Sequence, residues 1–224
     1  MLIKSDEMEG EELEIDKLLS LAKDIRTFEG NEVLFEENDP GDSLYIILEG
    51  RVEISLLWED GRRLGLDVMR PGFLFGEIAL FNPGPRTATA RTLEPCKLAL
   101  LSHDDLMMEI KKRPDLAVEI LLIMGQRMRW MNQQLHEYVF MPLPSRLARK
   151  LLYLLPEGGT AGEKLQLSQT GLADFAGATR EAVSKTLSGW KKQGILATSR
   201  GSMEVIDRSS LRAIAGFLKP AGSM

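Results

Sequence analysis

The sequence predicts an α+β protein: an N-terminal β-barrel, a long helix and a C-terminal winged helix-turn-helix. Three patterns predict this order: short strands up to about residue 101, a heptad repeat after it, and two short helices joined by a glycine turn. A chain of 224 residues with 44% hydrophobic content can bury two cores. We therefore expect a first domain at 1–140, with its long helix at about 113–140, and a second at 141–224.

Short β-strands are predicted between about Thr27 and Leu101. The turn signals between them are Pro40-Gly41, Asp60-Gly61, Pro71-Gly72 and Pro83-Gly84. Apolar residues alternate with other residues on both sides of the second turn: Val52, Ile54, Leu56 and then Leu64, Leu66, Val68. A period of two is typical of strands with one buried face, so we expect these residues to face the core. Several such strands predict a small antiparallel barrel or jelly roll.

A heptad repeat marks the long helix. Its apolar positions are Ala117, Leu121, Met124, Met128, Met131, Leu135 and Tyr138, spaced alternately by four and three residues. This a/d spacing is typical of a two-stranded coiled coil and predicts a homodimer. The alternative is a helix packed only on its own domain, which usually shows a broader apolar stripe. Because Ile120 and Ile123 widen the stripe, we expect contact with both the barrel and a partner.

A hinge is predicted where the long helix ends. Pro142 and Pro144 disfavour helix in the residue before each of them, so the chain from Phe140 to Ser145 should bend. A new helical pattern begins at Ser145 and stops before Pro156. The loop Pro156–Glu163 follows and is expected to be exposed.

The C-terminal domain carries the pattern of a winged helix-turn-helix. Ser168 can cap a first helix that Gly177 ends, and Thr179 can cap a second from Arg180 to about Gln193. Two helices joined by a short glycine turn are typical of DNA-reading domains. Residues 195–198 and 203–206 should form a two-stranded wing.

The second of these helices presents polar side chains suited to a major groove. Arg180 can bridge guanine O6 and N7, Glu181 can accept from cytosine N4, and Lys185 can donate to guanine or phosphate. Ser184 shares this polar face. Side chains expected to hold phosphates are Gln169, Thr170, Thr179 and Arg200. The alternative is an ordinary three-helix domain with a solvated face.

The segment Phe75–Ala90 predicts a site for a phosphate-bearing nucleotide. Gly76 and Glu77 open a short turn of helix over Ile78-Ala79-Leu80, and a Pro-Gly-Pro break precedes the run Arg86-Thr87-Ala88. A helix start offers free backbone N–H groups to an anion, and arginine adds a charged fork. Glu77 suits a ribose hydroxyl rather than a phosphate. The alternative is an ordinary turn beside a surface charge.

Composition excludes several other classes. One cysteine, Cys96, and two histidines, His103 and His136, are too few for a disulfide framework, an iron–sulfur cluster or a structural metal, and we expect no haem. No apolar run approaches the length of a membrane span and no secretory signal is recognisable, so we expect a cytoplasmic protein without a membrane partner. We find no nucleophile–base pair in the sequence, so we do not expect an enzyme.

Charge is distributed unevenly along the chain. The net charge is −5. Residues 141–224 hold 12 basic and 6 acidic side chains, a balance of +6, which leaves −11 for residues 1–140. A basic C-terminal segment suggests that a polyanion binds there.

Three segments resemble the cyclic-AMP receptor protein family of bacterial transcription regulators (CRP/FNR). They are PGDSLYIILEGRV (Pro40–Val52), FGEIALFNPGPRTATA (Phe75–Ala90) and GATREAVSKTL (Gly177–Leu187). The resemblance implies a nucleotide-binding jelly roll, a dimerising helix and a DNA-binding domain that reads a palindromic double-stranded operator. Glu77 is then the ribose acceptor, Arg86 with Thr87 the phosphate clamp, and Arg180, Glu181 and Lys185 the base readers.

Two positions depart from the family pattern. The long helix of cyclic-AMP-responsive members usually presents Thr followed by Ser or Asn to the adenine, whereas this chain has Met131-Asn132. Lys185 stands where arginine is common and loses the bidentate fork. We expect cAMP as the effector, with cGMP, another ligand or ligand-free activity as alternatives.

The resemblance also bears on partners. The loop Pro156–Glu163 could contact RNA polymerase by analogy with the family. A rival of another class is a nucleotide-binding module that controls a protein partner. The +6 balance and the charged reading face argue against that rival.

Overall fold

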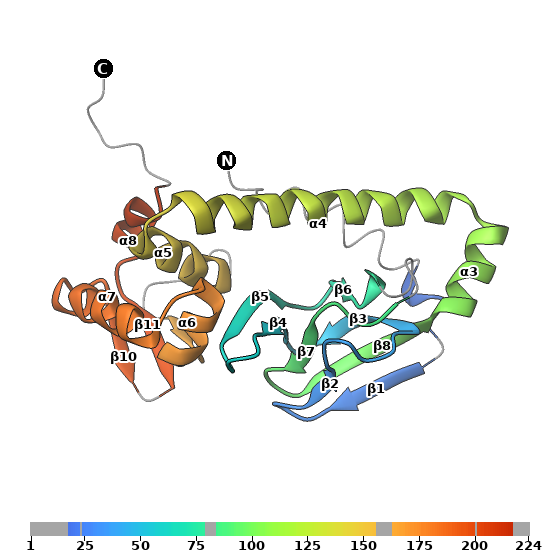
Figure 1. Cartoon of the computed structure of the whole chain (residues 1–224), viewed down its shortest axis with the longest axis horizontal. Coiled ribbons are helices and arrows are strands. Elements are labelled where there is room, and N and C mark those ends of the chain that lie inside the picture. Colours follow the sequence, from blue (N-terminus) through green and yellow to red (C-terminus); the bar gives the residue numbers. More distant parts are fainter. Residues whose placement is uncertain (1–17, 23, 79–83, 156–162, 200, 217–224) are drawn as a thin grey trace, which may run out of the picture. The chain divides into compact units, whose positions relative to one another are not determined.

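The computed structural model describes residues 18–22, 24–78, 84–155, 163–199 and 201–216 (Figure 1). The chain divides into two compact units. The barrel unit comprises Met1–Glu59 and Leu66–Met131, and the C-terminal unit comprises Asp60–Gly65 and Asn132–Met224. The loop predicted to approach RNA polymerase lies, apart from Glu163, outside the described residues.

In the part of the chain that the structure describes, two four-stranded sheets build the barrel. One has the order β1 (Asp24–Phe28), β8 (Cys96–Ser102), β3 (Ser43–Glu49), β6 (Leu74–Phe75). The other has the order β2 (Val33–Phe35), β7 (Thr89–Thr92), β4 (Val52–Leu57), β5 (Arg63–Met69). The strand pairs β1–β8, β3–β8, β3–β6, β2–β7 and β4–β7 are antiparallel, as predicted.

The sequence-based prediction of which face of β5 is buried was wrong. We expected Leu64, Leu66 and Val68 to point into the core, but Leu64 and Leu66 are only half-buried. The well-covered alternate positions are Gly65, Asp67 and Met69, although Val68 is buried as well. The apolar pattern misled because the covered face of this strand carries a glycine and a carboxylate, which hydropathy does not mark as interior.

Two helices follow the barrel strands. Ser102 caps α3 (His103–Lys112) by accepting from the Asp105 backbone N–H at 3.2 Å. The long helix is α4 (Asp115–Phe140). Its Ile120 and Ile123 are buried in the core cluster that also contains Leu74 of β6. The expected contact between this helix and the barrel is therefore confirmed.

The predicted heptad seam of α4 is exposed at four of its seven positions. Leu121, Met128, Met131 and Leu135 are 68%, 65%, 56% and 62% exposed. The other three positions, Ala117, Met124 and Tyr138, are half-buried. Met124 packs against the barrel core, and the Tyr138 hydroxyl donates to the Phe175 carbonyl at 3.1 Å. The helix therefore keeps an apolar stripe, shorter than predicted, that its own protomer leaves uncovered.

The break after α4 is narrower than predicted. Helix α5 runs Leu143–Leu154, so it begins two residues before the expected Ser145. Pro144 lies within its first turn, where the missing N–H has no helical partner in any case. Only Met141 and Pro142 separate the two helices.

The C-terminal unit has the predicted helix-turn-helix. Ser168 caps α6 (Gln169–Ala176), and Gly177 ends it with φ +57°. Thr179 caps α7 (Arg180–Lys192), whose Val183, Leu187 and Trp190 are buried. The wing is β10 (Leu196–Ser199) paired with β11 (Ser202–Val205). A third strand that the sequence did not reveal, β9 (Glu163–Leu165), pairs with β11, and α8 (Arg208–Ile214) follows.

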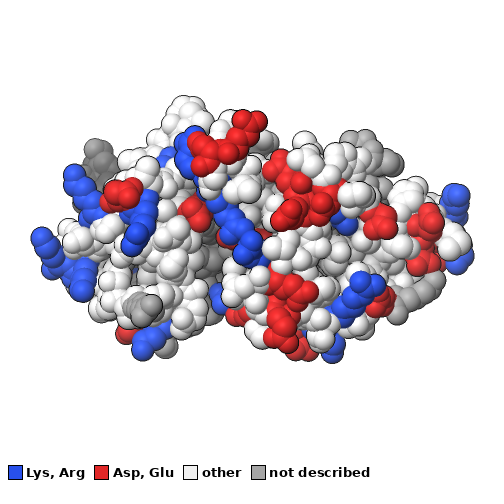
Figure 2. Space-filling model, turned by 60° about the horizontal axis from the view of Figure 1, so that its bottom comes forward, with Lys and Arg blue, Asp and Glu red and all other residues white. Residues whose placement is uncertain are grey.

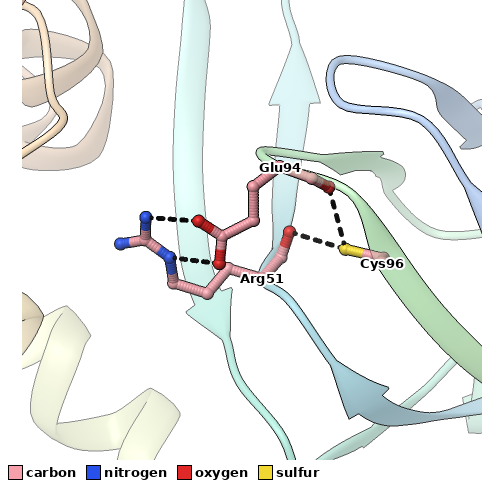
Figure 3. Close-up of polar contacts among 3 residues, drawn as sticks. All are labelled: Arg51, Glu94 and Cys96. Carbon is pink, nitrogen blue, oxygen red and sulfur yellow. Dashed lines mark hydrogen bonds and ion pairs between the residues drawn. The ribbon is translucent and has the colours of Figure 1, made fainter.

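Cys96 is a packing residue of the barrel (Figure 3). Its Sγ donates to the carbonyls of Glu94 at 3.2 Å and Arg51 at 3.3 Å. Arg51 and Glu94 also form a bidentate ion pair with N–O distances of 2.9 and 3.0 Å. Burial raises the pKa of the Cys96 thiol, so the thiolate is disfavoured.

Within the described residues, no helix is both long enough and apolar enough to cross a bilayer.

Candidate nucleotide and DNA sites

Backbone hydrogen bonds hold Arg86 in place. Its N–H donates to the Asp39 carbonyl at 2.8 Å, and its carbonyl accepts from the Asn38 N–H at 2.9 Å. The neighbouring Pro85 forms a bridge with Pro40. The segment before β3 therefore fixes the backbone of Arg86, which itself lies in the segment before β7.

Arg86 is only 4% exposed, so its guanidinium is buried. Its Nη1 donates to the carbonyls of Ser43 at 2.8 Å and Gly76 at 2.9 Å, and its Cζ lies 4.3 Å from the centre of the Phe35 ring. Among the described residues, no acceptor pairs with its buried Nε. A permanently charged group held this way keeps one N–H available for an anion.

The backbone at position 76 requires a glycine. Its φ is +83°, and a Cβ there would lie 2.7 Å from Arg86 Nη1. The contact between the two residues runs from Arg86 Nη1 to the Gly76 carbonyl, whereas the sequence led us to expect backbone N–H donors at this turn.

Glu77 is buried next to this cluster and pairs with a residue that the sequence did not reveal. The Arg127 Nη1 of α4 lies 2.6 Å from Glu77 Oε1, and the Glu77 side chain is 4% exposed. Arg127 Nη2 also donates to the Leu74 carbonyl at 2.6 Å. The presence of an arginine on the mostly apolar helix α4 could have indicated a buried ion pair. Nothing in the sequence indicated that its partner is Glu77.

The other predicted nucleotide-site residues are less enclosed. Ile78, Thr87, Met131 and Asn132 are exposed, whereas Ala88 is 8% exposed. Ala79 lies outside the described residues. The structure therefore brings together Gly76, Glu77 and Arg86 and adds Ser43 and Arg127 to them.

The predicted DNA-reading residues share the exposed face of α7. Those on the helix are Arg180, Glu181, Ser184 and Lys185, all exposed or nearly so. Thr179 is exposed too, but its hydroxyl accepts from the Ala182 N–H at 3.3 Å. On α6, Thr170 is exposed and Gln169 half-buried, and Arg200 lies outside the described residues.

The two units differ in charge on the face shown in Figure 2. The acidic groups gather over the barrel unit, and lysine and arginine prevail on the C-terminal unit (Figure 2). Lys191 and Lys192 in the last turn of α7 complement its helix dipole.

The end of α4 is tied to α5 and α6 by buried polar groups. Lys150 is 4% exposed. Its Nζ donates a hydrogen bond to Gln134 Oε1 and lies 4.3 Å from the centre of the Phe175 ring. Buried Glu137 pairs with Arg149 at 2.9 Å. Burial raises the pKa of Tyr138 to about 12. These contacts join the end of α4 to α5 and α6 within the C-terminal unit.

Among the described residues, no group of three or more His, Cys, Asp or Glu side chains could hold a metal ion.

Two family profiles match the chain. The cyclic nucleotide-binding domain matches residues 25–113, and the Crp-like helix-turn-helix domain matches residues 145–214. The CRP-like cAMP-activated global transcriptional regulator of Mycobacterium tuberculosis is 32% identical over 206 residues, 89% of this chain and 92% of the relative. The cyclic AMP receptor protein of Thermus thermophilus is 30% identical over 202 residues, 90% and 92% of the two chains.

Solved structures show the same fold. A CRP-family transcriptional regulator from Thermus thermophilus superposes with a TM-score of 0.75 at 25% identity, over 85% of this chain and 96% of the other. The regulator CLP of Xanthomonas campestris, described as c-di-GMP responsive, superposes with a TM-score of 0.75 at 24% identity, over 86% and 97%.

Proposed function

Because this chain belongs to the CRP family of transcription regulators, with a cyclic nucleotide-binding and a helix-turn-helix domain, we propose that it is a homodimer whose affinity for DNA is controlled by cAMP. The membership makes it a regulator rather than an enzyme. Because it binds DNA, we expect the protein to act in the cytoplasm.

The observation that carries the nucleotide proposal is the buried Arg86 guanidinium, whose Nε has no acceptor among the described residues. A cyclic phosphate supplies such an acceptor together with a compensating charge. Glu77 lies one residue from Gly76 and can accept from the ribose hydroxyl. Its Arg127 partner prevents it from facing the phosphate as an uncompensated charge.

The uncovered stripe on α4 supports the homodimer. Leu121, Met128 and Leu135 recur every seven residues and are all more than 60% exposed. Apolar side chains at heptad spacing bury one another when two copies of the helix pair. A two-fold dimer would then present two copies of α7 to half-sites about 34 Å apart.

The connection between the two sites runs along α4. Arg127 contacts the nucleotide-site carboxylate Glu77, and the same helix carries Gln134, Glu137 and Tyr138, which contact α5 and α6. A ligand shifts the equilibrium between DNA-binding states only by its different affinity for them. cAMP would act by changing the contacts of Glu77 and Arg127, and so the position of α4.

Calorimetry with cAMP, cGMP and AMP tests the effector. Removing the clamp by Arg86→Ala should weaken cAMP binding at least about tenfold, because a charged hydrogen bond in a buried site is lost. The matched control is Arg26→Ala on β1, an exposed arginine paired with Asp24, which should leave the affinity unchanged. Equal cAMP affinity in the wild type and Arg86→Ala would contradict the assignment of Arg86.

Selection of bound sites from random DNA tests the reading face. The wild type should enrich a palindrome, and Arg180→Ala should lose about 1–3 kcal/mol on that site but less on random DNA. Equal losses on both would indicate that Arg180 contacts phosphate only.

A further inference from the structure

The exposed side of α4 follows a heptad register that differs from the predicted one. The spacings are three and four residues in turn, and the members of this seam are Val118, Leu121, Gly125, Met128, Asn132, Leu135 and Val139. Its large apolar members are all more than half exposed. Asn132 is exposed as well, and Gly125 is half-buried. The predicted seam instead used Met124 and Tyr138, which lie one residue before Gly125 and Val139 and are partly covered by their own protomer.

The other side of α4 packs on its own protomer. Ile123 is buried in a core cluster of the barrel unit. Glu137 is 4% exposed and pairs with Arg149 at 2.9 Å within the C-terminal unit. Because successive residues of a helix are turned by about 100°, Ile123 and Glu137 lie across α4 from the seam. Each protomer therefore covers one side of this helix and leaves the heptad side open.

The chemistry of the seam fits a second copy of the same helix. In a heptad written abcdefg, the a positions are Val118, Gly125, Asn132 and Val139, and the d positions are Leu121, Met128 and Leu135. Valine at a with leucine at d favours two parallel strands. None of these positions carries a charge, so two copies of the face can meet without burying one. The occupant that this pattern fits is α4 of a second protomer.

Asn132 is the polar member of this otherwise apolar seam. In a parallel dimer in register, an a residue faces the same residue of the partner. Because an asparagine amide has both donors and an acceptor, two of them can bond each other. In a parallel dimer shifted by one heptad, Asn132 would face Gly125 or Val139, and in an antiparallel dimer it would face a d residue. Each of these arrangements buries the amide without a partner, which is costly.

We propose that Asn132 bonds Asn132 of the partner subunit across the two-fold axis and so fixes the parallel register of the dimer. This inference rests on the proposed homodimer. It assigns Asn132 to the partner helix, whereas the family resemblance implied a contact with the nucleotide base. A shift of one heptad would displace one helix by about 10 Å. The two copies of α7 would then lose the two-fold relation that a palindrome requires.

Mixing wild-type and variant protomers tests the pairing directly. The full-length wild type and Asn132→Val, one of them isotopically labelled, are incubated without nucleotide until the populations are constant. Native mass spectrometry then counts the two homodimers and the mixed dimer. Because the amide faces valine in the mixed dimer, this species should be at least about threefold less abundant than random pairing gives. The Asn132→Val homodimer should dissociate less readily than the wild type, since a polar a residue costs stability.

A second mixture tests whether the two copies of position 132 meet. Asn132→Asp and Asn132→Lys place opposite charges opposite each other only in the parallel dimer in register. Their mixed dimer should therefore be at least about threefold more abundant than random pairing gives. The matched control is Val139→Ala, at the a position one heptad later. Both partners are apolar there, so its mixed dimer with the wild type should match random pairing within about twofold.

The outcomes separate this inference from the proposed function. A wild type that sediments as a monomer overturns both the homodimer and the role of Asn132. A dimeric wild type with random pairing in either Asn132 mixture overturns the role of Asn132 alone. If circular dichroism shows that Asn132→Val does not fold, the mixture of Asn132→Asp and Asn132→Lys decides. Weaker cAMP binding by Asn132→Val together with random pairing would return Asn132 to the nucleotide site.

Discussion

Glu77 and Arg127 form a buried ion pair, with Oε1 and Nη1 2.6 Å apart and side chains 4% and 20% exposed. One residue adjoins Gly76 in the barrel, and the other lies midway along α4. The pair joins the proposed nucleotide site directly to the helix with the exposed apolar stripe. A ligand that changed the contacts of Glu77 would therefore act on α4 without an intermediate residue.

Removing one partner of this pair should destabilise the barrel. Arg127→Met leaves Glu77 as an unpaired buried carboxylate, which typically costs about 3 kcal/mol or more. Urea denaturation followed by circular dichroism measures the loss. The double variant Glu77→Gln with Arg127→Met should lose less than the sum of the single changes, because it buries no unpaired charge.

An exposed pair provides the control for that measurement. Arg26 and Asp24 have side chains 59% and 45% exposed, so Arg26→Met should change the free energy of unfolding by less than about 1 kcal/mol. If Arg127→Met costs no more than this control, the pair has no structural role.

Two glycines of the helix-turn-helix should respond to alanine with opposite signs. Gly177 has φ +57°, and its Cβ would lie 2.8 Å from Tyr138 Cε1, so Gly177→Ala should destabilise the C-terminal unit by about 1–2 kcal/mol. Gly189 lies inside α7, and a Cβ there would meet no neighbouring atom within 4 Å, so Gly189→Ala should stabilise the unit by about 0.5–1 kcal/mol. Thermal denaturation of both variants checks the signs, and a shift in the same direction contradicts this account.

Tyr138 should make stability fall at alkaline pH. Burial raises its pKa from 10.0 to about 12, so between these values the unfolded chain releases the phenolic proton first. Its contribution is fully present below pH 10 and is lost as the pH rises towards 12. Urea denaturation at about pH 9 and about pH 11 should show a larger loss for the wild type than for Tyr138→Phe. An equal loss in both proteins would mean that Tyr138 titrates normally.

The Cys96 thiol should be unreactive in the folded protein. It is 3% exposed, donates to two carbonyls, and has a pKa raised by burial. A thiol reagent such as 5,5′-dithiobis(2-nitrobenzoic acid) should label it slowly without denaturant and completely in concentrated urea. Rapid labelling of the folded protein would contradict its placement.

The helix-turn-helix was readable from sequence because each boundary has a local cause. Ser168 and Thr179 cap their helices through their own hydroxyls, and Gly177 takes the left-handed conformation that ends α6. The strand β9 was missed because its three residues pair with β11, nearly forty residues later, and carry no pattern of their own.

The nucleotide site was readable only in part. The cassette around Gly76 and Arg86 is local in sequence, so its residues could be named together. Arg127 reaches the same region through tertiary packing alone, and in the sequence it looked like an ordinary charged residue on its helix. The inward face of β5 was misassigned for the same reason, since Asp67 is buried although hydropathy places a carboxylate outside.

If cAMP in the barrel controls DNA binding by α7, as we propose, a single DNA titration should reveal it. Fluorescence anisotropy would measure the affinity for a palindrome selected from random DNA, with and without saturating cAMP, for the wild type and Arg86→Ala. cAMP should tighten binding by the wild type at least about tenfold and have no effect on Arg86→Ala. A wild-type affinity that cAMP leaves unchanged would overturn the proposed control by cAMP.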